Sequence, residues 1–159
     1  MITITWSKSA KSMRIVNTIK DSWTARVSCV VRNEENGWRK LDEVVYTIPD
    51  RLPYQPRTFP TGVWKIGRPE RETDPYLAPY FIPTNAAQDV ETWELTPEGA
   101  YHQPTGRMVR DSGYGLHFST SNTTIGCIKI RERGCLIRLV SEIIETLAAG
   151  QECTIEVSE

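Results

Sequence analysis

Residues 135–157, CLIRLVSEIIETLAAGQECTIEV, decide the fold class of this chain, because the spacing of apolar side chains changes there. From Cys135 to Leu147 the apolar residues recur every three and four positions, which predicts an amphipathic helix. Gly150 follows as the expected C-cap. Residues 153–157 then alternate apolar and polar side chains, as a strand does. The segment therefore predicts one helix late in the chain, followed by a final strand.

The residues before this helix predict a sheet. The predicted strands are 2–6, 14–19, 23–32, 38–48, 61–67 and 90–95. Asn36-Gly37, between two of these runs, is typical of a hairpin turn. Three segments rich in proline or turn residues predict loops, at 49–60, 68–89 and 97–110, and the second is as long as many lids and binding loops. The expected fold class is mainly β with one or two helices, the late amphipathic helix being packed on the sheet.

Length and composition fit a single domain, 1–159. The chain has 39% hydrophobic and 25% charged residues, a formal net charge of -1 and a pI of about 6.2, as in ordinary globular proteins. This balance gives no basic surface for nucleic acid. No apolar run approaches the ~20 residues of a membrane span. The first six residues alternate like a strand and lack the features of a signal peptide, so we expect a protein made without one.

The four cysteines, Cys29, Cys127, Cys135 and Cys153, match no zinc-binding spacing. Cys29 and Cys153 fall within predicted strands and are expected to be buried as small hydrophobic residues. Cys127 and Cys135 remain as candidate reactive thiols. Cys135 begins the helical pattern without a glycine turn or a close upstream histidine, so Cys127 is the preferred nucleophile and Cys135 the competing one.

Residues 115–130, GLHFSTSNTTIGCIKI, place His117 shortly before Cys127. An imidazole can take the proton of a thiol, and a thiolate is the nucleophilic form of cysteine. Gly126 leaves room for a sharp turn, from which the N–H of Cys127 and of a neighbour in 124–126 could bind an oxyanion. A third group should orient His117, and a backbone carbonyl would suffice. The other histidine, His102, is expected at the surface, and chance proximity of His117 and Cys127 remains an alternative.

Two motifs carry a family resemblance. His117 followed by Thr124-Ile125-Gly126-Cys127-Ile128-Lys129 resembles the catalytic pattern of the L,D-transpeptidase (YkuD-like) family, and residues 59–66 resemble its upstream Thr-Pro-x-Gly strand. The resemblance covers 58–157, with 1–57 left as an N-terminal β meander. Ile125 stands where the family usually has histidine, and Lys129 where it usually has arginine. The short loop before Cys127 resembles the compact branch among antibacterial effectors of type VI secretion.

The resemblance implies a YkuD-like β-sandwich and a Cys–His enzyme acting on peptidoglycan stem peptides, without a metal or organic cofactor. The thiolate would attack the carbonyl before a terminal D-alanine. An acceptor amine would then give cross-linking or D-amino-acid exchange, and water would give L,D-carboxypeptidase cleavage. Thr124 and Gly126 would shape the pocket, and Lys129 would contact a substrate carboxylate or stay solvated. Tyr114 and Trp64 are candidates for the lining of the groove, and for Trp64 core packing is the preferred interpretation.

The same resemblance implies action in the bacterial periplasm or cell wall, reached by a non-classical secretion route, with an immunity or secretion-delivery protein as a partner. Two other functions remain open. One is a non-catalytic β-rich module that binds cell-wall peptides or a partner protein, favoured by the changes at Ile125 and Lys129. The other is a cytosolic thiol hydrolase of different substrates.

Overall fold

The computed structural model describes residues 1–31, 39–40, 54–99 and 101–159. Within these ranges the chain forms twelve strands and one helix, α1 (Arg133–Ala148). The predicted fold class, mainly β with a late helix packed on a sheet, is confirmed. The predicted Asn36-Gly37 hairpin turn and most of the predicted strand 38–48 lie outside the described residues.

Nine strands form one sheet, and the strands nearest the two chain ends lie side by side in it. In order across the sheet these are β5 (Gly62–Lys65), β12 (Cys153–Ser158), β1 (Ile2–Ser7), β2 (Ser12–Asn17), β3 (Trp23–Ser28), β11 (Ile128–Ile130), β10 (Gly115–Phe118), β7 (Tyr80–Pro83) and β6 (Glu70–Arg71). β1, β2 and β3 are an antiparallel meander, while β12 pairs with β1 in parallel. The N-terminal meander thus lies between strands from the C-terminal half.

The sheet curls so that the end of its edge strand β5 meets the end of β7, next to the opposite edge. Ile66, just after β5, forms an antiparallel bridge with Thr84, just after β7. The N–H of Gly67 donates to the carbonyl of Pro83 at 2.9 Å. Side chains alternate along each strand, so one face of the curled sheet supplies the core, with Ile2 and Ile4 of β1 fully buried.

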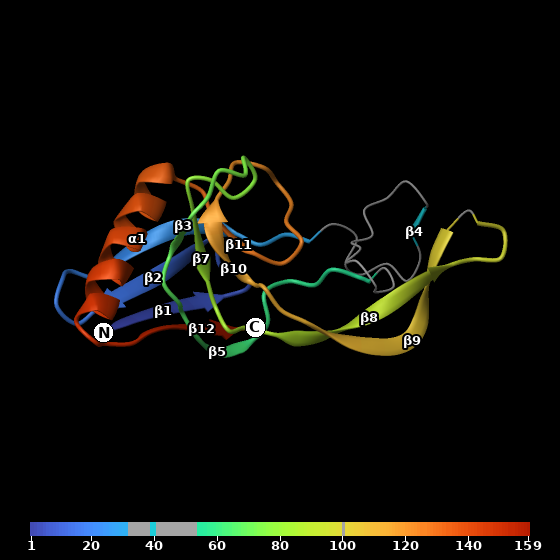
Figure 1. Ribbon diagram of the computed structural model, residues 1–159, viewed down its shortest axis with the longest axis horizontal. Coiled ribbons are helices and arrows are strands. Elements are labelled where there is room, and N and C mark those ends of the chain that lie inside the picture. Colours follow the sequence, from blue (N-terminus) through green and yellow to red (C-terminus); the bar gives the residue numbers. More distant parts are fainter. Residues whose placement is uncertain (32–38, 41–53, 100) are drawn as a thin grey trace.

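Helix α1 covers this core from one side. Leu136, Leu139, Val140 and Ile143 are its buried apolar residues, and they pack near β7, β10, β11 and β12. Burial of each such side chain stabilises the folded state by roughly 1.5–3 kcal/mol relative to leaving it exposed. Ala149 is the C-cap, one residue before the predicted Gly150, and Gly150 follows with φ of 74°, which a glycine adopts readily just after a helix. Figure 1 shows the helix lying beside the strands of the meander.

A second sheet projects from this body. It contains β4 (Arg39–Lys40), β9 (Tyr101–Asp111) and β8 (Gln88–Leu95), and β8 and β9 form the long hairpin that extends away from the helix in Figure 1. The prediction of turns at 97–110 is therefore wrong. Pro104 and Gly106 are tolerated within β9 because the pairing shifts there, from Glu91–Met108 to Trp93–Pro104, and the extra residues bulge.

Three further predictions have a structural outcome. His102 is buried within β9, so the prediction of a surface position is wrong, because a strand replaces the expected turns. The segment 68–89 is only partly irregular, since β7 pairs with both β10 and β6. Cys29 and Cys153 are buried as predicted. Among the described residues, no helix combines the length and apolar character required to cross a membrane.

Candidate functional site

Cys127 and His117 lie on neighbouring parallel segments of the sheet. β10 pairs with β11 in a register that places His117 opposite Lys129 and Leu116 opposite Ile128. Leu116 and Ile128 point into the core, so His117 and Lys129 lie on the other face. Cys127 precedes Lys129 by two positions and continues that face, and its thiol is hydrogen-bonded to the backbone of Gly115 at the start of β10. The loop 119–127 thus returns the chain beside the strand that carries the histidine.

The imidazole of His117 is held by a backbone carbonyl. Its Nδ1 lies 3.2 Å from the carbonyl oxygen of Phe118, and a carbonyl can only accept, so Nδ1 carries the proton and Nε2 has the free lone pair. Burial lowers the pKa of His117, with a further contribution from the charge of Lys129, although the Phe118 carbonyl opposes this. His117 is therefore a neutral imidazole near neutral pH, which is the form that acts as a base.

The thiol of Cys127 keeps its proton in the resting site. Burial raises its pKa and the carboxylate of Asp111 adds to this, while the Gly115 hydrogen bond and the charge of Lys129 act in the opposite direction. With a raised thiol pKa and a lowered imidazole pKa, the thiol and the imidazole each rest in the neutral form.

A tight turn presents Cys127. Gly126 has φ of 136°, which favours glycine, and the hydroxyl of Thr124 accepts its N–H at 3.2 Å. The N–H of Thr124 donates to the carbonyl of Val30 at 2.9 Å. Thr124 and Gly126 therefore both shape the turn, and their N–H groups are already bonded, that of Gly126 within the turn and that of Thr124 to Val30. An oxyanion hole built on this turn would use the N–H of Cys127.

Tyr114 forms the wall behind the turn. Its hydroxyl donates to Asp111 at 2.8 Å and accepts from the amide of Gln88 at 2.9 Å, and its ring packs edge-on against Phe59 with centroids 5.7 Å apart. Desolvation by burial raises the pKa of Tyr114 far above its usual range. Tyr114 thus remains protonated and supports the turn. Neither Asp111 nor Gln88 was identified from the sequence, because neither residue belongs to a recognisable motif.

Two cations on β11 and just after it hold the loop. The ammonium of Lys129 is buried and donates to the hydroxyl of Ser121 and the carbonyl of Thr123. The guanidinium of Arg131 donates to the carbonyls of Ser121 at 2.6 Å and Thr120 at 3.0 Å. Lys129 is thus directed at its own loop, and would contact a substrate carboxylate only by exchanging these bonds. Arg131 was missed, although its spacing of two from Lys129 places it on the same face.

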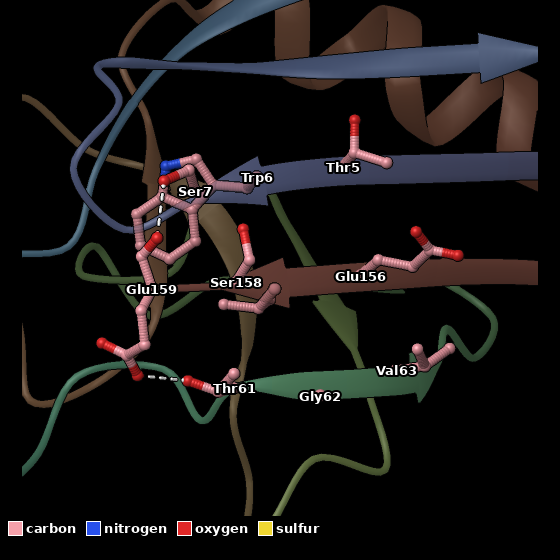
Figure 2. Close-up of a pocket in the computed structure, with 10 residues that line it drawn as sticks. Thr5, Trp6, Ser7, Thr61, Gly62, Val63, Glu156, Ser158 and Glu159 are labelled. Atoms are coloured by element: carbon pink, nitrogen blue, oxygen red, sulfur yellow. Dashed lines mark hydrogen bonds between the residues drawn. The ribbon is translucent and has the colours of Figure 1, made fainter.

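The two remaining sequence candidates lie elsewhere. Trp64 on β5 pairs with buried Ile155, packs against the core, and donates its indole N–H to the carbonyl of Pro60 at 2.9 Å. Figure 2 shows the outer face of β5, β12 and β1, where a groove of about 500 Å³ is lined by residues such as Thr5, Val63 and Glu156 rather than by Trp64. Cys135 belongs to α1, on the core side of β11, whereas Cys127 and His117 are on the other side. The structure therefore groups Thr124, Gly126, Lys129 and Tyr114 with Cys127 and His117.

No family model, curated protein or solved structure matches this chain. Within the described ranges, no group of three or more His, Cys, Asp or Glu side chains is arranged to hold a metal ion.

Proposed function

We propose that this protein is a cysteine acyl-transfer enzyme in which Cys127 is the nucleophile and His117 the general base. One observation supports this most strongly. Both residues lie on one face of two adjacent parallel segments, and the Phe118 carbonyl leaves Nε2 of His117 free to accept a proton. Nucleophilic catalysis by cysteine uses a histidine base oriented by a third group, and the Phe118 carbonyl is such a group for His117.

The chemistry follows from the neutral resting pair. As the sulfur of Cys127 attacks a carbonyl carbon, Nε2 of His117 takes the thiol proton and the carbonyl electrons move to oxygen, near the N–H of Cys127. The intermediate collapses, the C–N bond breaks, and the imidazolium gives its proton to the departing amine. The acyl group then rests on sulfur as a thioester. Water or a second amine attacks it, with His117 again taking the proton, and the thiol is restored.

The substrate part of the proposal is supported by the sequence resemblance alone. We infer that the acyl donor is a peptidoglycan stem peptide with a terminal D-alanine. Reaction with an amine gives cross-links or exchanged D-amino acids, and reaction with water gives L,D-carboxypeptidase cleavage. Action in the periplasm or cell wall, and use as an antibacterial effector with an immunity partner, belong to the same proposal.

A non-catalytic binding module for cell-wall peptides or a partner protein is the second candidate. The raised pKa of the Cys127 thiol favours it, because a protonated thiol is a poor nucleophile. The bonds that Lys129 makes to its own loop favour it as well, since they occupy a cation expected to meet substrate.

The test is incubation of the purified protein with tetrapeptide muropeptides, followed by mass spectrometry of the products. We expect D-alanine loss, D-alanine exchange or a new cross-link with the wild type, no product with Cys127→Ala or His117→Ala, and near-normal product with Cys135→Ala. Absence of any Cys127-dependent product would favour the binding module. Equal losses in the Cys127 and Cys135 variants would contradict the assignment of the nucleophile.

A further inference from the structure

A groove of about 740 Å³ lies along β3 and the turn between β1 and β2. Four cations line it, Lys8, Lys11, Arg26 and Arg131, together with the polar side chains of Ser28 and Asn122. No acidic side chain is among its lining residues. This is a local excess of positive charge in a chain whose formal net charge is -1. Such a concentration of one charge sign in a concave surface raises the local concentration of ligands of the opposite sign.

The groove shares a wall with the candidate active site. Asn122, in its lining, belongs to the loop that precedes Cys127, and Arg131 holds the same loop through its backbone carbonyls. Cys29, also in the lining, donates its thiol hydrogen to the carbonyl of Gly126 at 3.2 Å. A ligand lying in the groove therefore ends next to the turn that presents the nucleophile.

The four cations of the groove differ in how far they are available to a ligand, since Lys8 pairs with Glu159 at 3.5 Å and donates to the hydroxyl of Thr58 at 3.2 Å. Lys11 is exposed, and its side chain makes no ion pair or hydrogen bond within the described part of the chain. Arg26 pairs with Glu132 at 3.0 Å, but the two side chains are 69% and 53% exposed. An exposed ion pair of this kind contributes little to stability, so the charge of Arg26 stays accessible to a ligand. The hydroxyl of Ser28 is buried and has no hydrogen-bond partner among the described residues.

We propose that this groove binds an acidic peptide segment. This segment is the carboxylate-bearing part of the substrate that donates its acyl group to Cys127. The inference rests on the proposed acyl-transfer function. Peptide carboxylates fit better than phosphate, because neither guanidinium offers an unoccupied fork of N–H groups: Arg131 donates to loop carbonyls, and Arg26, although its charge is accessible, shares its Nε–H with Glu132. Lys11 is a point charge that suits a single carboxylate, and Val30, 57% exposed, offers apolar contact to a peptide.

Binding is tested directly with labelled tetraglutamate by fluorescence anisotropy at low and physiological salt. Tetraglutamine and inorganic tripolyphosphate serve as comparison ligands. We expect the wild type to bind tetraglutamate at least 10-fold more tightly than either, with weaker binding at higher salt. Lys11→Glu should weaken binding by at least about 10-fold. The matched control is Lys65→Glu, which makes the same change of charge on β5, outside the groove, and should leave binding unchanged.

Each contrary result overturns a defined part of the inference. No binding of tetraglutamate, equal binding by Lys11→Glu, or tighter binding of tripolyphosphate would overturn the acidic-peptide site. Muropeptide turnover that depends on Cys127 but has the same KM in Lys11→Glu would overturn the groove as a substrate site while leaving the enzyme in place. Groove-dependent peptide binding without any Cys127-dependent turnover would instead overturn the proposed acyl transfer.

Discussion

The ring of Tyr114 lies against the α-carbon of Gly126. A β-carbon at position 126 would stand 2.5 Å from Cε1 of Tyr114 and 2.9 Å from the carbonyl oxygen of Arg57. The backbone of Gly126 also has φ of 136°, which side chains rarely adopt. Because Gly126 directly precedes Cys127, these two constraints fix the turn that carries the proposed nucleophile.

Gly126→Ala should therefore lose both stability and activity. Gly113 offers a matched control, since its φ is also positive, at 85°, but a β-carbon there would meet nothing within 4 Å. We expect Gly113→Ala to lower the free energy of unfolding by about 1 kcal/mol, the cost of the backbone conformation alone. Gly126→Ala should lower the free energy of unfolding by about 3 kcal/mol, because the clash of the new β-carbon with Tyr114 adds to the backbone cost. Urea denaturation measures both, and equal losses would contradict the contact with Tyr114.

The Cys127 thiol should titrate above its ordinary value of about 8.5. Burial and Asp111 both raise its pKa, so Asp111→Asn should shift the midpoint of alkylation to lower pH. Lys129 acts in the opposite direction, so Lys129→Met should shift it to higher pH. The measurement is the rate of iodoacetamide labelling of Cys127 across a pH series, read by mass spectrometry in a Cys135→Ala background. A midpoint below the ordinary value would contradict the neutral resting pair.

Activity should fall on the acid side with a midpoint below 6.5, the ordinary pKa of histidine. A lowered pKa means that His117 stays in its neutral, proton-accepting form to more acidic pH, so activity is retained until pH falls through that lower value. The raised thiol pKa predicts no alkaline limb below about 8.5. The pH dependence of kcat/KM on a tetrapeptide muropeptide tests this, and an acid midpoint above 6.5 would contradict the environment described for His117.

The parts of the fold set by local periodicity were predictable from sequence. The 3.6-residue spacing after Cys135 and the alternation at both chain ends gave α1, β1 and β12 with boundaries close to those observed. Strand β9 was missed because Pro104 and Gly106 are turn residues when considered locally, and only pairing with β8 shows that a bulge accommodates them.

The site was predictable to a similar extent. The sequence placed His117, Gly126 and Cys127 close together because nine residues or fewer separate them along the chain. Asp111 and Gln88 reach the site through Tyr114, across strand pairings that no local pattern encodes. Trp64 was a candidate because of a motif, but the register of β5 with β12 turns it toward the core. Side-chain direction there depends on pairing, which single-sequence periodicity does not fix.

Lys129→Met should release the loop 119–125. The methionine keeps much of the apolar stem but cannot donate to Ser121 and Thr123, which lose a charged donor. We expect faster amide hydrogen exchange across this loop, including the N–H of Thr124, with little change in α1. Lys65→Met, at an exposed position on β5, is the control. Unchanged exchange in the Lys129 variant would show that Arg131 alone holds the loop.

The buried carboxylate of Glu142 should stabilise the join between α1 and β2. Its side chain is 4% exposed, accepts the amide of Asn17 at 2.8 Å and pairs with Arg138 at 3.1 Å. Glu142→Ala leaves the buried amide of Asn17 without an acceptor, so we expect a loss of about 2 kcal/mol in the free energy of unfolding.

Glu145 is the matched control for Glu142 because it lies three positions further along the same helix and is exposed. It pairs with Lys20 at 2.7 Å, with side chains 56% and 48% exposed, so Glu145→Ala should cost no more than about 0.5 kcal/mol. Urea denaturation of the two variants under the same conditions gives the comparison. Losses of similar size would show that the buried bonds of Glu142 to Asn17 and Arg138 contribute no more to the free energy of unfolding than an exposed ion pair does.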